Sequence, residues 1–357
     1  MRAGWLKVTA SSFLFDFYSS VDNFDFYRTV PLDFKTSFTM NKLSKFTISL
    51  LSLVLLVAID TAHAQEANPL EGRWNLKITK DGEELSSWLE IEHSGSHTLV
   101  GRFCYAFGSA RPIAEVKAKD GKFNFAIPVQ WEPGEGDMAF EGQLAGGQLK
   151  GTMRYTDGKK YNWTGTRAPK LAYVDNPEWG EPITLFNGRD LSGWHAMGEN
   201  QWKVVSGVLT SEKSGANLVS DQKFNDFKLH LEFRYPEGSN SGVYLRGRYE
   251  VQIVDSYGMD PSSGLLGGIY GLITPNQMVA KKAGTWQSYD ITLIGRRVTV
   301  VLNGKTIISD QAIAGMTGGA LDNNEAEPGP LMFQGDHGAI EFRNIIITPR
   351  VEGKKSE

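Results

Sequence analysis

The sequence contains a single cysteine, Cys104, among 357 residues, so no internal disulfide can stabilise the chain. It has no excess of basic residues, because 37 Lys and Arg stand against 41 Asp and Glu. A chain with that balance has no net positive charge to attract the phosphate groups of a nucleic acid. No apolar run reaches the about 20 residues that a membrane-spanning helix needs. We therefore expect core burial to stabilise the protein, with no nucleic-acid partner and no permanent membrane anchor.

The longest apolar run belongs to an export signal. Residues 40–45 form a positively charged start, residues 46–59 an uncharged apolar run, and residues 62–64 the small-residue pattern Ala-His-Ala. We predict a signal peptide over residues 40–64, cleaved between Ala64 and Gln65, and a periplasmic or secreted product. Residues 1–39 show no sustained period. We interpret them as an upstream extension and expect translation to start at Met40.

Turn dipeptides divide residues 65–168 into short alternating runs. Asp81-Gly82 and Asp120-Gly121 supply the positive φ angles of tight hairpins. Runs such as Lys122 to Ile127 alternate with the period of two that is typical of half-buried strands. No helical stripe interrupts them. The pattern predicts a small antiparallel β meander or barrel of about eight strands.

A second β-rich domain is predicted over residues 182–350. Residues 169–181 contain two prolines and no period, as expected of a linker. The segment after them has many strands joined by long connections, with one or two short helical stretches near residues 277–282. This favours a two-sheet sandwich, followed by a tail over residues 351–357.

Two connections in this domain are far longer than a hairpin needs. They run over residues 255–284 and 310–329. Loops of this length in a compact domain are usually functional or disordered. Their Gly, Tyr and Pro content favours a packed rim around a pocket.

Four motifs in the second domain resemble the 3-keto-disaccharide hydrolase family in order and spacing. They are LFNGRDLSGW at 185–194, NSGVYLR at 240–246, YEVQIVD at 249–255, and FQGDHG at 333–338 leading to EFRNI at 341–345. The resemblance covers residues 182–350 and leaves the N-terminal β domain uncovered. It implies a concanavalin-like jelly roll that acts on glycosides oxidised to a ketone at sugar C3.

Such a reaction needs a base for the C2 proton, stabilisers for the oxyanion, and a donor for the leaving oxygen. Strand alternation places Glu250 with Gln252, and Tyr244 with Arg246, on the faces opposite their apolar neighbours. His337 lies in a glycine-flanked loop and is suited to acid–base work. We expect Glu250, His337 and Arg246 to be catalytic. The substrate-binding candidates are Gln252, Tyr244, Tyr270, Trp286, Gln334, Asn240 and Asp255.

Structural roles compete with these assignments. Arg246 and Glu250 could form a cross-strand pair on a solvated face, and His337 could be an ordinary loop histidine. Core packing competes for Trp286 and Tyr270, and Asp255 suits the capping of a loop. No His-x-x-x-His or EF-hand pattern is present, so we expect no strong metal site built from protein ligands alone. A weakly bound divalent ion that assists enolate formation stays open as a cofactor.

At the level of function, two alternatives to the ketoglycoside enzyme stay open. A jelly roll can be a non-catalytic carbohydrate-binding module, since fold alone does not assign activity. An ordinary retaining glycoside hydrolase would need two carboxyl groups about 5–5.5 Å apart. The sequence leaves the oligomeric state open.

Overall fold

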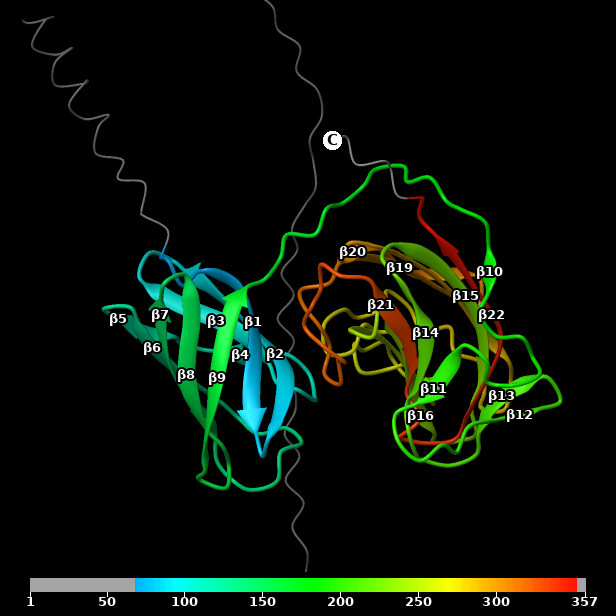
Figure 1. Cartoon of the computed structure of the whole chain (residues 1–357), viewed down its shortest axis with the longest axis horizontal. Coiled ribbons are helices and arrows are strands. Elements are labelled where there is room, and N and C mark those ends of the chain that lie inside the picture. Colours follow the sequence, from blue (N-terminus) through cyan, green and yellow to red (C-terminus); the bar gives the residue numbers. More distant parts are fainter. Residues whose placement is uncertain (1–67, 352–357) are drawn as a thin grey trace, which may run out of the picture. The chain divides into compact units, whose positions relative to one another are not determined.

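The computed structural model describes residues 68–351 (Figure 1). The predicted signal peptide and upstream extension lie outside these residues, as does most of the predicted tail. The regular structure between residues 68 and 351 consists of β-strands, as predicted. No helix in the described part of the chain is long and apolar enough to cross a membrane.

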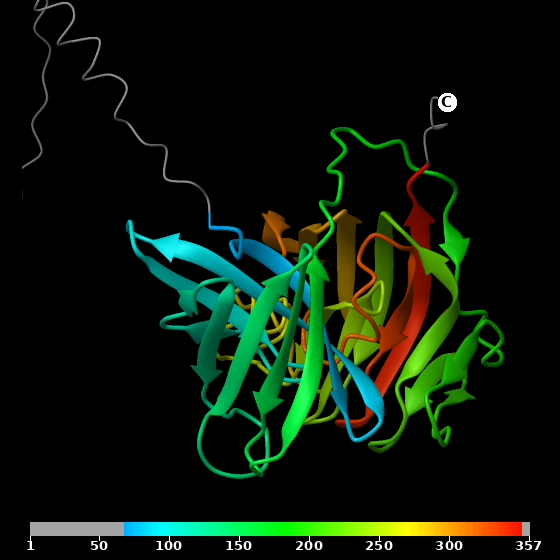
Figure 2. The same cartoon turned by 60° about the vertical axis from the view of Figure 1, so that its left-hand side comes forward.

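The first nine strands form one antiparallel sheet in the order β4-β3-β2-β1-β9-β8-β7-β6-β5. The sheet is a curled meander, as Figure 2 shows, and it has one strand more than the about eight predicted. The strands are β1 (Gly72–Lys80), β2 (Glu83–Ser94), β3 (Thr98–Cys104), β4 (Arg111–Ile113), β5 (Lys117–Lys119), β6 (Lys122–Ile127), β7 (Met138–Ala145), β8 (Gln148–Arg154) and β9 (Lys160–Arg167).

We call this nine-stranded sheet, with its connections, the N-terminal layer. The alternation of buried and exposed side chains along its strands creates its core. In β6 every second side chain is buried, and the hairpin before it turns at Asp120 and Gly121, both with positive φ. The buried face gathers large aromatic residues, among them Trp74, Phe103, Phe140 and Trp163.

The remaining strands form the predicted sandwich of two antiparallel sheets. One has eight strands in the order β12-β13-β22-β15-β18-β19-β20, with β10 also pairing with β22, and the other has the order β11-β14-β21-β16-β17. The strands are β10 (Ile183–Thr184), β11 (Trp194–Ala196), β12 (Lys203–Val205), β13 (Val208–Ser211), β14 (Leu218–Phe224), β15 (Phe227–Arg234), β16 (Asn240–Leu245), β17 (Tyr249–Val254), β18 (Gln287–Ile294), β19 (Arg297–Leu302), β20 (Lys305–Ala312), β21 (Gly329–Phe333) and β22 (Ile340–Pro349).

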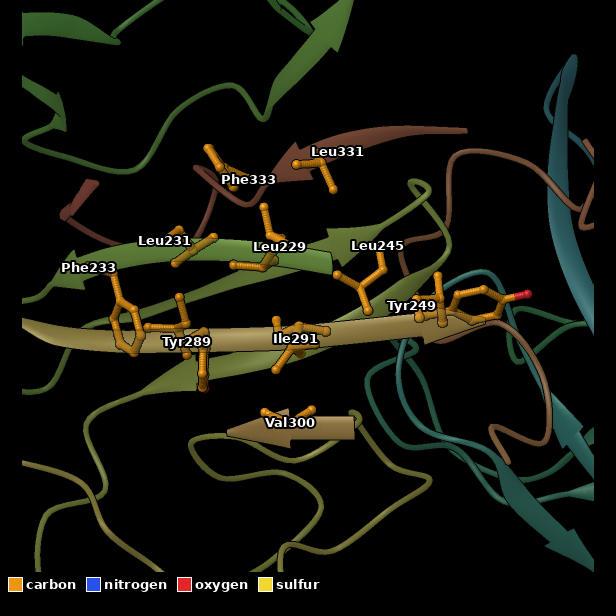
Figure 3. Close-up of a cluster of buried hydrophobic side chains, with 14 of the residues drawn as sticks. Leu229, Leu231, Phe233, Leu245, Tyr249, Tyr289, Ile291, Val300, Leu331 and Phe333 are labelled. Carbon is orange, nitrogen blue, oxygen red and sulfur yellow. The ribbon is translucent and has the colours of Figure 1, made fainter. Parts of the chain in front are cut away.

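The two sheets of the sandwich bury their apolar faces against each other. Figure 3 shows side chains of this core from both sheets. The labelled residues include Leu229, Leu231 and Phe233 of β15, Tyr289 and Ile291 of β18, and Leu331 and Phe333 of β21. Because side chains of a strand alternate, this core fixes which residues of β16 and β17 face the other way.

The short helical stretch predicted near residues 277–282 is absent. The segment consists of bends and irregular backbone. Its neighbourhood is bonded to other parts of the sandwich instead, since Asn276 N donates to Ile307 O and Lys281 N donates to the side chain of Gln287. These tertiary partners replace the local hydrogen bonds of a helix.

The long connection between β17 and β18 covers an otherwise free sheet edge. Gln252 N donates to Gly268 O at 2.9 Å, Gly267 N donates to Gln252 O at 3.0 Å, and Tyr270 N donates to Glu250 O at 3.1 Å. An uncovered edge strand would expose these backbone groups. The same bonds fix Tyr270 beside Glu250.

The N-terminal layer and the sandwich share buried polar contacts within a single compact unit that starts at Ala67. Arg73 of β1 forms an ion pair with Glu325, which also accepts a hydrogen bond from Tyr249 at 2.8 Å. Trp88 of β2 donates its indole N–H to Met316 O at 2.7 Å. The segment between β20 and β21 therefore links the two parts.

We expect Glu325→Ala to destabilise the protein by about 3–5 kcal/mol, because Arg73 would lose its partner inside the molecule. The Glu325 side chain has no exposed surface. The free energy of unfolding, measured by urea denaturation, checks this expectation.

Glu84→Ala is the matched control, because Glu84 pairs with Lys77 at the exposed surface. A surface pair of this kind contributes about 0–1 kcal/mol. An equal effect of the two substitutions would contradict the structural role of Glu325.

Candidate active site

A cavity of about 460 Å³ lies on the face of the five-stranded sheet that points away from the sandwich core. Its volume falls in the about 300–1,000 Å³ range of small-molecule sites. The lining residues come from β16, β17, the loop before β14, the loop after β21, the two long connections and the N-terminal layer. They are Phe107, Gly108, Trp131, Asn217, Asn240, Tyr244, Glu250, Gln252, Tyr270, Gly318, Gly319, Gln334, Asp336 and His337.

Glu250 is the buried carboxyl group of this cavity. Its neighbours Tyr249 and Val251 point into the sandwich core, so alternation turns Glu250 to the cavity side. Only 3% of its surface is exposed. Burial disfavours the charged form and raises the pKa of Glu250 to about 8, while the Tyr244 hydroxyl and the charge of His337 act in the opposite direction.

The Tyr244 hydroxyl can follow the protonation state of Glu250. It lies 3.0 Å from Glu250 Oε2 and 2.9 Å from Gly318 O, but it carries one proton. When Glu250 is protonated, its carboxyl can donate to Tyr244, which donates to Gly318 O. When Glu250 is ionised, Tyr244 can donate to the carboxylate. Burial holds the pKa of Tyr244 well above 10, so the phenol keeps its proton in both states.

Gly242, on the neighbouring strand β16, provides room for the carboxyl group. A methyl group added at Gly242 would lie 2.4 Å from Glu250 Oε1, closer than non-bonded atoms can approach. The glycine of the NSGVYLR motif therefore shapes the floor of the cavity.

His337 forms an ion pair with the adjacent Asp336, Nδ1 to Oδ1 at 2.6 Å. That hydrogen bond raises the pKa of His337 above its usual 6.5, and partial burial opposes the shift. The charge of Glu250 also favours the protonated imidazole. With Nδ1 engaged by Asp336, the other ring nitrogen can donate a proton to a ligand.

Three amide side chains carry unpartnered buried oxygens at the cavity. Gln252 Oε1, Gln334 Oε1 and Asn240 Oδ1 are inaccessible and have no hydrogen-bond partner among residues 68–351. An unpaired buried acceptor costs about 1–3 kcal/mol.

Seven of the ten residues predicted for the site line this one cavity. They are Glu250, His337, Gln252, Tyr244, Tyr270, Gln334 and Asn240.

Arg246 is not among the cavity residues, contrary to our expectation. Strand β16 ends at Leu245, and Arg246 has a φ of 53° at the start of the turn, so alternation no longer governs its direction. Its guanidinium donates to Gly295 O at 2.8 Å and lies 3.2 Å from both Glu325 O and the Tyr249 hydroxyl. These bonds hold it away from Glu250.

Trp286 and Asp255 also lie outside the cavity lining. The Trp286 ring packs against the guanidinium groups of Arg234 and Arg343, 4.8 and 4.0 Å from its centroid. Asp255 Oδ2 accepts the backbone N–H of Gly238 at 3.0 Å. Asp255 thus caps the turn before β16, whereas its position at a strand end had suggested a cap for the loop that follows it.

No group of three or more His, Cys, Asp or Glu side chains between residues 68 and 351 is arranged to hold a metal ion. The cavity contributes one histidine and two carboxyl groups, and two of these three are already paired with each other.

Comparison with known proteins identifies the sandwich. Residues 181–348 match the family described as "3-keto-alpha-glucoside-1,2-lyase-like domain". The chain contains a domain of this family.

The chain is also similar to one curated protein and to solved structures. A 3-keto-disaccharide hydrolase from Bacteroides thetaiotaomicron is 28% identical over 91 residues, which are 22% of this chain and 31% of that protein. This chain therefore matches less than a third of the curated relative. Two candidate glycosyl hydrolases from Parabacteroides distasonis are similar in structure. They have 30% and 20% identity, cover 50% and 48% of this chain and 93% and 94% of theirs, and give TM-scores of 0.41 and 0.42.

Three cavity residues, Phe107, Gly108 and Trp131, lie outside the lyase-like domain. Sequence reasoning missed them because nothing in the N-terminal strand pattern indicates which loop reaches the sandwich. Within the domain it also missed Asn217, Asp336 and the Gly318-Gly319 dipeptide. A glycine pair inside a long connection was the available signal for the dipeptide.

The raised pKa of Glu250 predicts a pH-dependent stability difference between the wild type and Glu250→Gln. The folded state binds the Glu250 proton more tightly than the unfolded state, in which the carboxyl has the ordinary glutamate pKa of 4.5. Raising the pH from about 4.5 to about 8 should therefore destabilise the wild type relative to the variant, by at most about 1.4 kcal/mol per pH unit. Urea denaturation of both proteins across this range checks the sign. A difference that does not change with pH would contradict it.

Proposed function

We propose that this protein is an exported enzyme that cleaves 3-keto-glycosides, with Glu250 as the base. The observation that carries the proposal is a buried carboxyl group of raised pKa in a cavity whose amide oxygens lack partners. The family description names a 1,2-lyase of 3-keto-glucosides and the Bacteroides relative is named a hydrolase. Export rests on residues 40–64 of the sequence.

The first step is removal of the C2 proton. The C3 ketone makes this hydrogen acidic, and the electrons of the C2–H bond move into an enolate. A general base works best when its pKa lies near the working pH. The pKa of about 8 makes Glu250 a stronger base than an ordinary carboxylate while a usable fraction stays ionised near neutrality.

The second step is loss of the C1 substituent. The enolate collapses, the C3 carbonyl re-forms, a C1–C2 double bond forms and the bond from C1 to the glycosidic oxygen breaks. That oxygen needs a proton, and His337 is the cavity group whose protonated form is favoured by its neighbours. Addition of water across C1 and C2 then gives the free 3-keto sugar, so that one water is consumed and one alcohol is released.

The amide groups have a binding role in this proposal. Gln252, Gln334 and Asn240 would hold the hydroxyls and the ketone of the oxidised ring against Glu250. Fixed dipoles of this kind stabilise a developing oxyanion with little reorganisation.

We expect Glu250→Gln to lower turnover of 3-keto-trehalose about 10²- to 10⁴-fold while the thermal unfolding transition is retained. Released glucose gives the rate. Deuterium at C2 of the oxidised ring should slow the wild type, because the C2–H bond breaks in the first step. Glu341→Gln is the control, since Glu341 pairs with Arg234 outside this cavity.

Other results would reject the proposal. Binding of 3-keto-trehalose without release of glucose would favour a carbohydrate-binding module. Hydrolysis of an unoxidised aryl glucoside at a comparable rate would favour an ordinary glycoside hydrolase, and Asp336 would then be the second carboxyl group of the cavity.

A further inference from the structure

Trp131 is the most exposed large apolar residue of the described chain, with 67% of its surface accessible. It lies in the connection between β6 and β7, and it lines the same cavity as Glu250. A lone exposed aromatic residue is unremarkable. An exposed aromatic residue on a rigid support beside a reactive group indicates a binding surface.

The support of Trp131 is a buried ion pair. Arg111 donates to both oxygens of Glu132, at 2.8 and 3.1 Å, and both side chains are almost fully buried. Glu132 Oε2 in turn accepts the backbone N–H groups of Gln130 and Trp131, at 2.8 and 3.2 Å. The backbone at Trp131 is therefore fixed from within while its indole faces outward.

Residues 106–109 of the N-terminal layer pack closely against glycines of the lyase-like domain. A methyl group added at Gly318 would lie 2.3 Å from Gly108 O, and one at Gly271 would lie 2.3 Å from Ser109 Cβ. Gly319 N also donates to Ala106 O at 2.8 Å. Residues 106–109 thus contact both long connections of the sandwich directly.

Two aromatic side chains of the N-terminal layer flank this contact. Phe107 is 40% exposed and packs edge-on against Tyr105, with ring centroids 4.9 Å apart. The indole of Trp131 packs beside Gly108, where an added methyl group would lie 3.0 Å from its Cδ1, and it lines the cavity together with Tyr270. The cavity is therefore polar and buried at Glu250 and aromatic and open at Trp131.

We propose that Trp131 and Phe107 form a stacking subsite for the group attached to C1 of the 3-keto-glycoside. This inference rests on the proposed function, because it assumes that the oxidised ring lies at Glu250. The C–H face of a second sugar ring, or an aryl aglycone, would pack against the indole. The leaving group would then bind at the accessible end of the cavity, from which it can depart after cleavage.

The oxidised ring and the C1 substituent are assigned to different ends of the cavity, because the end at Glu250 is polar and the end at Trp131 is aromatic. The oxidised ring carries the ketone and hydroxyls that match Gln252, Gln334 and Asn240, and its C2 must reach Glu250. The C1 substituent takes no part in proton abstraction, so it needs contact area and few hydrogen bonds. Aromatic faces supply that contact.

The test compares two substrates that share the oxidised ring. Methyl 3-keto-glucoside has a minimal C1 substituent, whereas 3-keto-trehalose has a second sugar at that position. We expect Trp131→Ala to lower kcat/KM for 3-keto-trehalose about tenfold and to change the value for the methyl glycoside less than about twofold. The loss should appear mainly in KM, and Trp131→Phe should restore most of it.

Tyr173→Ala is the matched control, because Tyr173 is also an exposed aromatic residue and does not line the cavity. It should leave both substrates unaffected. Equal losses on both substrates with Trp131→Ala, or no loss on either, would overturn the subsite alone. A wild type that cleaves neither substrate would overturn the proposed function and the subsite together.

Discussion

Burial of one carboxyl group is the constraint on which the site depends. Glu250 lies on the face of β17 that is opposite the sandwich core, where a carboxylate would ordinarily be solvated. It is buried because the long connections and the N-terminal layer cover that face, with Gly318 in contact with Gly108. The resulting desolvation raises its pKa into the range of a base useful near neutral pH. The N-terminal layer is therefore part of the chemical environment of the lyase-like domain.

Two interactions reduce the free-energy penalty of burying the Glu250 carboxyl group. The Tyr244 hydroxyl can bond to Glu250 in either protonation state because Gly318 O offers an alternative acceptor. The imidazole of His337, held by Asp336, supplies a nearby positive charge. The first arrangement depends on two glycines, because a methyl group added at Gly242 would collide with Glu250 and one added at Gly319 would collide with Tyr244. Gly242 of the NSGVYLR motif is therefore explained by the space that the Glu250 carboxyl group needs.

The sequence allowed the all-β fold and much of the cavity to be predicted because strand alternation is a local property. It correctly turned Glu250, Gln252 and Tyr244 away from Val251 and Val243. Strand alternation predicted the wrong direction for the Arg246 side chain, because Arg246 follows the last residue of β16 and has the positive φ of a turn. Trp131 could not be predicted at all, because its place depends on how two β parts far apart in the sequence pack together. Alternation carries no information about that packing.

Exchange of the C2 hydrogen tests the central claim most directly. A 3-keto-1,5-anhydroglucitol has the acidic C2 hydrogen but no group at C1 to eliminate, so proton abstraction is isolated from cleavage. In D₂O the wild type should introduce deuterium at C2 well above the buffer rate, as followed by proton NMR, and Glu250→Gln should not. Exchange at the buffer rate with the wild type, or equal exchange with both proteins, would contradict the assignment of Glu250 as the base.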